Sequence, residues 1–485
     1  MKKSEMNLIR GCILTMVVYI ALVGVFYIIA GDQLRYKQEE SNMVSPMSPA
    51  GELLAGDIVQ QRLIPEGDEI MSVTLKIGTY GRNNQGSIAI RLKEEGKTLS
   101  EEIIDVSKLI DNSNYTVVFD DPIKQMKNTE LYLQIESVDG SPGNAVTVWY
   151  GNSISTGRVE ASQQISSKDK IIVNGMNLNG VLCLSVKSRT YLLTGDYYWH
   201  IMIILGVFLM LGLFLLVYQQ QRGNPGLLLH MITAFTRYRF LLEQLVSRDF
   251  KTKYKRSALG VVWSFLNPLM MMAVQYIVFS TLFKSDIPNF AVYLLIGIVV
   301  FSFFSEACNM SMMSIVGNAS LITKVYVPKY IFPVSRVISS TINLLLSLIP
   351  LLIVILVTRT PITPALFLLP FAIFCLVGFC IGMSFILASA MVFFRDTQFL
   401  WSVINMLWLY ITPIFYPESI IPEGFMTIYK MNPLYQIIRF MRVVLMDGVS
   451  PEPIAYLFCL MAALIPLIIG GLVFKKTQDK FILNI

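Results

Sequence analysis

Eight charge-poor apolar runs set the strongest limit on what this chain can fold into. About 20 consecutive apolar residues are enough for a helix to cross the hydrocarbon core of a bilayer. The composition agrees, with 54% hydrophobic and only 15% charged residues, whereas a soluble domain carries about 25% charged residues. We therefore predict an α-helical polytopic membrane protein with about eight spans. The runs are residues 11–30, 197–218, 259–283, 290–316, 337–357, 365–394, 399–417 and 453–474.

The first apolar run has two interpretations. It follows Lys2 and Lys3, as the core of a signal peptide would. However, it is long enough to span a membrane, and the flank after Gln33 lacks a small-x-small cleavage signature. We expect a retained signal anchor.

Charged residues on the two sides of the spans indicate the topology. With the N-terminus inside, the cytoplasmic segments carry 18 Lys and Arg, and the short outer loops carry five. Because cytoplasmic loops are enriched in Lys and Arg, we expect both termini in the cytoplasm of a bacterial cell, at the cytoplasmic membrane. Residues 31–196 then lie outside the cytoplasm.

The long polar segment 31–196 alternates between apolar and polar residues with a period of two. Met71, Val73, Leu75 and Ile77 form one such series, and four further series follow between turn signals such as residues 81–86. Several short strands with turns between them are typical of an antiparallel sandwich. We predict an extracytoplasmic antiparallel β-sandwich or jelly-roll domain.

Five cations stand within nine residues immediately before the third apolar run. A basic stretch that abuts a span is a cytoplasmic marker, and its Lys and Arg interact with anionic headgroups. Upstream, apolar residues at helical spacing lie among Arg237 and Arg239, which predicts an amphipathic helix in the headgroup plane. The five cations are Arg248, Lys251, Lys253, Lys255 and Arg256.

The sequence lacks the motifs of an enzyme. It contains no GxxxxGK[ST] phosphate-binding loop, no HExxH and no GxSxG. The six cysteines show no metal-binding spacing, and two histidines are too few for a His-based metal site. We predict a transport or scaffold protein with neither a metal nor a cofactor of its own.

The segment 318–335, NASLITKVYVPKYIFPVS, lies between two spans on the cytoplasmic side. It places apolar residues next to Lys324 and Lys329. A short amphipathic element of this kind is suited to docking into a partner's groove. A loop helix lying on the membrane surface explains the same pattern.

Three stretches together resemble a known family. RDFKTKYKRSALGVVWSFLNPL, the segment 318–335, and FFRDTQFLWSVINMLWLYITPIFYP followed by KMNPLYQIIRFMRVVLMDG look like the membrane subunit of type-2 ABC exporters for polysaccharides and polyol phosphates. These exporters include those for O-antigen and teichoic acid. The resemblance covers roughly residues 228–485, and the first 220 residues depart from it because typical members lack them.

The resemblance implies a six-helix exporter core, a homodimer, and two copies of a separate ABC ATPase that binds ATP and Mg²⁺. It implies that segment 318–335 is the coupling helix and that segment 418–446 forms outer re-entrant helices. The expected domains are residues 1–30 (head and first span), 31–196 (β-sandwich), 197–218 (second span), 219–258 (interface helix) and 259–485 (exporter core). The expected coupling residues are Asn318, Leu321, Lys324, Val325, Tyr326 and Pro328.

Aromatic rings are candidates to line a sugar channel, because they stack on the C–H faces of sugars while their polar edges bond to hydroxyls. Packing between helices and aromatic belts at the membrane interface explain such rings equally well. The candidates are Trp263, Tyr276, Phe283, Tyr293, Phe301, Phe304, Trp401, Trp408, Tyr410 and Tyr416.

Charged and polar residues supply two further candidates. Glu306 is the one acid well inside a predicted span, where it faces either the substrate path or a structural contact with Asn309. The five cations of the basic run bind either the pyrophosphate of a lipid carrier or membrane headgroups.

The β-sandwich resembles carbohydrate-binding jelly rolls, and this fold analogy makes it a candidate glycan platform. A protein contact or a cover over the pore are the alternatives for this domain. The candidate residues are Tyr80, Tyr115, Tyr132 and Trp149.

Taken together, these patterns favour the membrane subunit of an ATP-driven exporter that moves a lipid-linked polysaccharide or a teichoic-acid-like polymer across the cytoplasmic membrane. A scaffold or chain-length regulator of surface glycan also places an ectodomain between two spans, but it leaves six spans unexplained. A membrane glycosyltransferase requires an acidic or metal-binding outer loop, which the sequence does not offer.

Overall fold

The computed structural model describes residues 3–41, 43–65, 67–124, 126–151, 171–222, 227–254, 259–282, 289–325 and 327–484. The chain forms two compact units. A helical unit contains Met1–Gln33 and Tyr198–Ile485, and a β domain contains Leu34–Tyr197.

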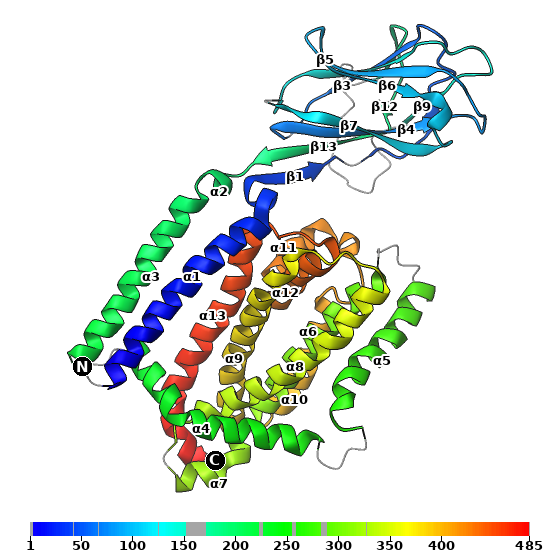
Figure 1. Ribbon diagram of the computed structural model, residues 1–485. Helices are drawn as coiled ribbons and strands as arrows, with labels where there is room; N and C mark the ends of the chain where they lie inside the picture. Colours follow the sequence, from blue (N-terminus) through cyan, green and yellow to red (C-terminus); the bar gives the residue numbers. More distant parts are fainter. Residues whose placement is uncertain are drawn as a thin grey trace. The chain divides into compact units, whose positions relative to one another are not determined.

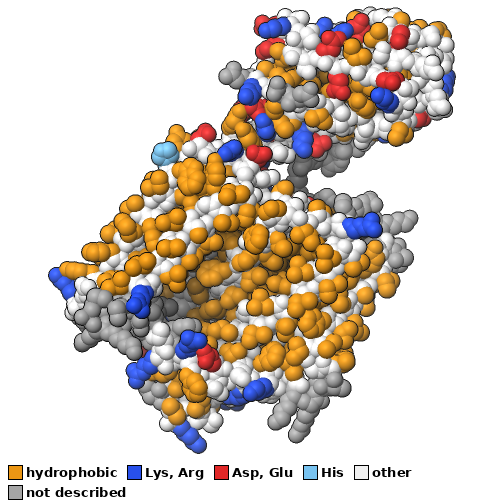
Figure 2. Space-filling model, in the orientation of Figure 1, with side chains coloured by type: hydrophobic (Ala, Val, Ile, Leu, Met, Phe, Trp, Pro, Cys, Tyr) orange, Lys and Arg blue, Asp and Glu red, His pale blue; other side chains and the backbone are white. Residues whose placement is uncertain are grey.

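The helical unit contains seven helices, among the described residues, that are long and apolar enough to cross a membrane. Figure 1 shows them as a bundle, with α4 crossing one end of it. Figure 2 shows apolar side chains covering the visible face of this unit. Its helices are α1 (Lys3–Arg35), α3 (Tyr198–Gln221), α4 (Leu227–Tyr254), α5 (Trp263–Ile277), α6 (Phe290–Met312), α7 (Ala319–Lys324), α8 (Ile331–Val357), α9 (Leu369–Phe393), α10 (Thr397–Ile411), α11 (Glu423–Met431), α12 (Pro433–Arg442), α13 (Pro453–Thr477) and α14 (Phe481–Asn484).

The core of the bundle centres on α6, which is the most buried of the seven spans. Helix α9 packs beside α6, and α13 crosses α9 at very short range. A Cβ placed on Gly470 would lie 2.1 Å from the carbonyl oxygen of Gly382. Small residues permit this approach, which is how membrane helices pack where the hydrophobic effect cannot drive them together.

The predicted span at residues 399–417 is shorter than expected. Helix α10 has 15 residues and ends at Ile411. The reason is Pro413: the residue before a proline is pushed out of the helical region, and Thr412 is extended, with φ −83° and ψ 127°. The chain continues into the short helices α11 and α12. Asn432 joins them and caps α12 by accepting a hydrogen bond from the Leu434 N–H at 3.1 Å.

The β domain consists of two antiparallel sheets that enclose one apolar core. This is the antiparallel sandwich predicted from the period-two pattern. One sheet has the order β1-β13-β4-β9-β12, with β7 beside β4 and β2 beside β9; the other has the order β11-β10-β3-β8-β5-β6. The strands are β1 (Tyr36–Glu40), β2 (Ser48–Pro49), β3 (Ile58–Leu63), β4 (Glu69–Gly78), β5 (Ser87–Glu94), β6 (Lys97–Asp105), β7 (Ser113–Lys124), β8 (Leu131–Ser137), β9 (Thr147–Gly151), β10 (Ile172–Val173), β11 (Met176–Asn177), β12 (Val181–Leu182) and β13 (Leu184–Tyr191), and the short helix α2 (Leu193–Asp196) follows them.

One register detail differs from the simple alternation. Val73, Leu75 and Ile77 are buried as predicted, but Ile70 rather than Met71 completes the buried series. The pairing of β4 with β7 shifts between Ile70 and Ser72. An irregularity of this kind inserts an extra residue and changes the face that the neighbouring side chains occupy.

Helix α4 is amphipathic, as the sequence predicts. Leu245 and Val246 are buried, and Leu245 packs in a small apolar cluster with Phe332 of α8 and Phe481 of α14. Charged residues also occupy its exposed side, where Arg239 and Glu243 form an ion pair at 2.7 Å.

Candidate functional site

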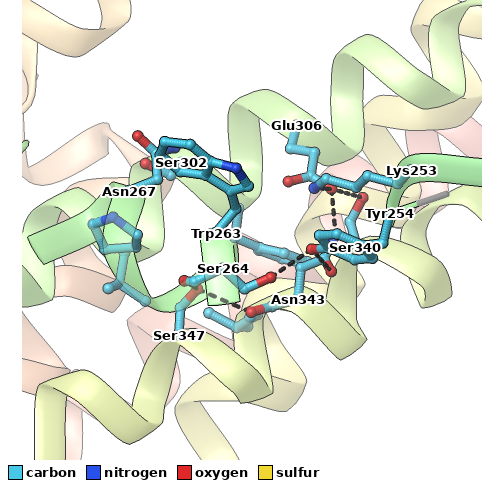
Figure 3. Close-up of a pocket in the computed structure, with 14 residues that line it drawn as sticks. Lys253, Tyr254, Trp263, Ser264, Asn267, Ser302, Glu306, Ser340, Asn343 and Ser347 are labelled. Carbon is cyan, nitrogen blue, oxygen red and sulfur yellow. Dashed lines mark hydrogen bonds and ion pairs between the residues drawn. The ribbon is translucent and has the colours of Figure 1, made fainter. Parts of the chain in front are cut away.

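A cavity of about 270 Å³, lined by both polar and apolar side chains, lies between the C-terminal end of α4 and helices α5, α6 and α8. Such a cavity among apolar spans is unusual, because polar groups at membrane depth are costly unless they are paired or serve a path for polar substrates. Figure 3 shows hydroxyl, amide and charged side chains converging on it. The polar and aromatic lining residues are Lys253, Tyr254, Trp263, Ser264, Asn267, Ser302, Glu306, Ser340, Asn343 and Ser347.

Glu306 is the centre of the hydrogen bonds in this cavity. Its Oε1 accepts from Lys253 Nζ at 2.8 Å and from Asn343 Nδ2 at 2.7 Å. The Tyr254 hydroxyl donates to Asn343 Oδ1 at 2.9 Å and also bonds to Ser264. Helices α4, α5, α6 and α8 are therefore joined through one continuous polar chain.

A second cavity, of about 560 Å³, adjoins the first on the side of the α6–α8 connection. Lys253 and Glu306 line both cavities, so their ion pair stands where the two cavities meet. The second cavity is also lined by Arg248, Asp249, Thr252, Met310, Gly317, Asn318 and Arg336.

Asp249 is a buried acid that joins three elements beside this second cavity. Its side chain is 3% exposed, and its Oδ1 lies 2.9 Å from Arg336 Nη1 of α8 and 3.2 Å from Arg248 Nη2 of α4. Arg248 Nη2 also donates to Asn318 Oδ1 at 3.3 Å. A buried charge persists only when it is paired, and here the pairing ties α4 both to α8 and to the segment that precedes α7.

The predicted coupling segment forms α7 and its flanks. Asn318 is buried and donates to the Ser314 carbonyl at 2.7 Å. Leu321 is partly buried, Lys324 and Val325 are exposed, and Pro328 is half-buried. Tyr326 lies outside the described residues.

Of the five cations in the basic run, two form contacts within this site. Arg248 and Lys253 take part in the polar chain and the buried ion pairs described above. Lys251 is exposed on α4. Lys255 and Arg256 lie outside the described residues.

Four of the predicted channel aromatics are core residues. Tyr293, Phe301, Phe304 and Trp401 are at most 7% exposed and belong to the main apolar core. Phe304 stacks on Phe379 of α9 with ring centroids 5.3 Å apart. Burial inside one subunit leaves these four rings little free surface, and their assignment to the channel remains a prediction.

The other predicted aromatics are more accessible. Trp263, Tyr276 and Tyr410 are 46%, 42% and 58% exposed, and Trp263 lines the first cavity. Two half-buried rings, Trp408 and Tyr416, have their polar atoms occupied: Trp408 Nε1 donates to Asn432 Oδ1 at 2.9 Å, and Tyr416 donates to the Tyr410 carbonyl at 2.7 Å. Phe283 lies outside the described residues.

The predicted glycan residues of the β domain do not form one platform. Tyr115 of β7 packs against the core, and Tyr132 of β8 belongs to the six-stranded sheet. Trp149 of β9 belongs to the other sheet, where its Nε1 donates to Asn112 Oδ1 at 2.8 Å. Tyr80 follows β4 in a turn and lies near Arg82. Because the four rings belong to two different sheets and to a turn, they do not share one face.

Sequence reasoning missed the partners of the charged residues. Asp249 stands among five cations, and that contrast was an available signal. Arg336 and Asn343 occupy α8 seven residues apart, which places them two turns apart on one helix face. Glu306 was singled out, but its predicted contact with Asn309 is replaced by Lys253 and Asn343; Asn309 donates to Ser305 instead, at 3.4 Å.

Arg442 is one of the five cations that the sequence assigns to the outer loops, and the structure buries it. Its guanidinium lies 3.3 Å from the ring centroid of Tyr293 and donates to the carbonyl of Pro413 at 2.8 Å. It therefore satisfies backbone groups that the break after α10 leaves without helical partners.

The fold and the cavity define a multi-pass membrane protein whose spans enclose hydrogen-bonding groups suited to a polar cargo, joined to a separate β-sandwich. Residues 241–446 match the family described as ABC-2 type transporter. The chain is 32% identical over 244 residues to the "O-antigen export system permease protein RfbA" of Klebsiella pneumoniae, which is 50% of this chain and 93% of that protein. This chain belongs to the ABC-2 type transporter family and is a permease subunit.

Two further relatives align over a similar length at lower identity. The "O-antigen export system permease protein RfbA" of Myxococcus xanthus is 28% identical over 258 residues, which is 52% of this chain and 98% of that protein. The "Polysialic acid transport protein KpsM" of Escherichia coli is 23% identical over 252 residues, which is 51% of this chain and 97% of that protein. The family match lies within the helical unit and leaves the β domain outside it. Membership of this family implies an ABC ATPase as partner.

Proposed function

We propose that this protein is the membrane subunit of an ATP-driven exporter that moves a lipid-linked polysaccharide across the bacterial cytoplasmic membrane. The observation that carries the proposal is the cavity around Glu306. Its serine, asparagine and tyrosine side chains offer donors and acceptors to a hydroxyl-rich chain, and Trp263 offers a stacking surface. The relatives named for O-antigen export and polysialic acid transport support a glycan as the cargo.

The proposed assembly is a homodimer with two copies of a separate ABC ATPase. The sequence contains no phosphate-binding loop of its own, so ATP and Mg²⁺ are assigned to the partner. Both termini and α7 are assigned to the cytoplasmic side, and the β domain to the extracytoplasmic side, from the distribution of Lys and Arg.

The contacts around Asp249 suggest how ATP-driven motion reaches the cavity. In this mechanism the ATPase moves α7, and the bond between Asn318 and Arg248 passes that motion to α4. Asp249 holds α4 against Arg336 of α8, which serves as the fixed side. Lys253 lies one turn further along α4. Movement of α4 therefore breaks or restores the ion pair between Lys253 and Glu306 at the junction of the two cavities.

The basic end of α4 is proposed to receive the phosphate-bearing end of the lipid carrier. Lys251 is exposed there and lies near Arg248 in a shallow recess. Cationic groups bind phosphate strongly when they converge, and each also attracts anionic lipid by about 1 kcal/mol. A teichoic-acid-like polymer attached to a lipid carrier of the same kind is the second cargo proposed to bind at the basic end of α4.

The proposal is tested by deletion and purification. Affinity purification of the full chain should recover an ABC ATPase, and deletion should leave completed polymer inside the cell while surface polymer is lost. Restoring the gene in trans should return polymer to the surface. Unchanged amounts of surface polymer and of its cytoplasmic precursor would reject the exporter. Altered chain length with normal surface delivery would favour the chain-length regulator.

A further inference from the structure

The outward face of the six-stranded sheet in the β domain carries an ordered polar plane that the family match does not cover. Strand register places Gln60, Gln134, Arg91 and Glu101 side by side across β3, β8, β5 and β6. The next row along these strands consists of Arg62, Tyr132, Lys93 and Thr98. Neighbouring strands are about 4.8 Å apart, so each row of four extends over about 14 Å.

Alternation along β8 shows that these side chains point away from the core. Leu131, Leu133 and Ile135 are fully buried in the apolar core, and Tyr132 and Gln134 stand between them on the opposite face. Gln134 is nevertheless only 5% exposed, because long side chains from the two adjacent strands lie over it.

The side chains of this plane hold one another in place. Gln60 Nε2 donates to Gln134 Oε1 at 3.3 Å, and Arg91 Nε donates to Glu101 Oε1 at 2.7 Å. Arg91 also pairs with Glu136 in the adjoining row. These contacts, with the bond to Glu136 first, raise the pKa of Arg91 above its ordinary value. An ordinary solvated face has mobile charged side chains, whereas this one is bonded into a fixed pattern of donors and acceptors.

Both arginines of the plane are paired with carboxylates, and Lys93 adds one further cation. Arg91 faces two carboxylates, and Arg62 lies 2.5 Å from Glu130. A surface built to hold phosphate groups leaves its cations available in a converging cluster. Here the two arginines are already paired, and a polyanion would also meet the carboxylates. Besides Lys93, the plane offers amides, paired charges and one tyrosine ring, which suits uncharged hydroxyl groups and the C–H face of a sugar ring.

We infer that this face, centred on Tyr132 and Gln134, binds a neutral stretch of glycan rather than a phosphate-rich polymer. The inference rests on the proposed function for its choice of ligand, since it assigns the β domain to the exported chain. The opposite outer face supplies a contrast: β4 and β7 present Thr74 and Thr116 there, whose hydroxyls bond to each other at 2.9 Å. Lys76, Asn114 and Lys187 share that face by strand register.

The test uses the purified full chain in detergent and two fluorescent probes. One probe is the pool of neutral oligosaccharides released from the surface polymer of the host strain, and the other is an oligomer of glycerol phosphate. Wild-type protein should bind the neutral pool, and Tyr132→Ala should weaken binding at least tenfold. Gln134→Ala should weaken it by a smaller factor. Tyr80→Ala, an exposed aromatic of the same domain, is the control and should bind as wild type does.

Three results would overturn the inference: absence of binding to the neutral pool, stronger binding to the phosphate oligomer, or equal loss in Tyr132→Ala and Tyr80→Ala. Protection of Cys183, a buried thiol of the β domain, from a membrane-impermeant thiol reagent shows that each variant remains folded. If Tyr132→Ala exposes Cys183, Tyr132→Phe is used in place of Tyr132→Ala. The inference is then sustained if Tyr132→Phe binds as wild type does and Gln134→Ala loses binding. This experiment measures binding and not export. Binding can therefore be absent while surface display still shows export, and export can be absent while the β domain still binds glycan.

Discussion

The two faces of α6 carry opposite chemistry on one helix. One face presents Phe304, which is fully buried between the rings of α9 and α10. The other presents Glu306, which lines both cavities and pairs with Lys253 of α4. The same span therefore contributes to the packed core on one side and to an ionic contact between helices on the other. Stability and transport should therefore respond to different substitutions.

The largest expected effect is on the packed face. Phe304→Ala removes a ring that contacts Phe379 and Trp408, and such a deletion costs about 3–5 kcal/mol. We expect less folded protein and a lower thermal transition in detergent, with the ATP consumed per exported chain unchanged in the protein that remains. A changed ratio of ATP to export at normal stability would show that the packed face also takes part in coupling.

The next effect concerns Asp249. Asp249→Asn removes the counter-charge of Arg336, whose side chain is 22% exposed, and leaves it beside a second cation, Arg248. Breaking a fully buried pair costs about 3–5 kcal/mol, and the partial exposure of Arg336 makes the expected cost smaller. We expect ATP hydrolysis by the purified complex to continue while surface export falls at least tenfold. The charge exchange Asp249→Arg with Arg336→Asp should recover part of the export.

The matched control lies on the same helix. Arg239 and Glu243 form an exposed pair, and exposed pairs contribute only about 0.3–0.5 kcal/mol. Replacing both with Gln should change neither hydrolysis nor export. If this control uncouples the complex as strongly as Asp249→Asn does, α4 responds to any change of charge and Asp249 has no special part.

A smaller effect is expected at the junction of the cavities. Glu306→Gln keeps a hydrogen-bonding group for Asn343 but loses the ion pair with Lys253, and Lys253→Gln loses the same pair from the other side. Each should lower export several-fold, and the double variant should be no worse than either single one. Because non-additivity measures the contact itself, losses that simply multiply would mean that the two residues act separately.

The smallest effect is expected at Lys251. Lys251→Gln removes an exposed cation worth about 1 kcal/mol toward an anionic phosphate. We expect export to fall a few-fold without loss of membrane insertion, measured against Lys476→Gln, an exposed lysine near the end of α13. If Lys251→Gln and Lys476→Gln lower export equally, Lys251 interacts only with anionic lipid headgroups.

Much of the fold follows from local patterns, and the exceptions have identifiable causes. Apolar run lengths predicted the spans, and period-two alternation predicted the strands. The short α10 depends on Pro413, whose effect is local and was open to prediction. The shift between Ile70 and Ser72 depends on pairing with β7, which the sequence of β4 alone does not contain.

The site was harder to predict because it depends on which helix faces meet. Glu306 was conspicuous as an acid in a span, but its partner Lys253 is 53 residues away. The aromatic residues were equally conspicuous, yet Phe304 and Trp401 point into the subunit core whereas Trp263 lines the cavity. Composition marks such residues as unusual, and only packing decides whether a ring meets a neighbour or a cavity.

The central claim is that this permease exports glycan when its ATPase partner hydrolyses ATP. The direct measurement reconstitutes the co-purified complex in vesicles with the lipid-linked glycan of the host strain and follows glycan that becomes protected from an external glycosidase. Inside-out orientation makes transport run into the lumen. The account predicts protection that requires ATP, is absent with a non-hydrolysable analogue, and is lost in Asp249→Asn while hydrolysis persists. Hydrolysis by the wild-type complex with no glycan protected would contradict it.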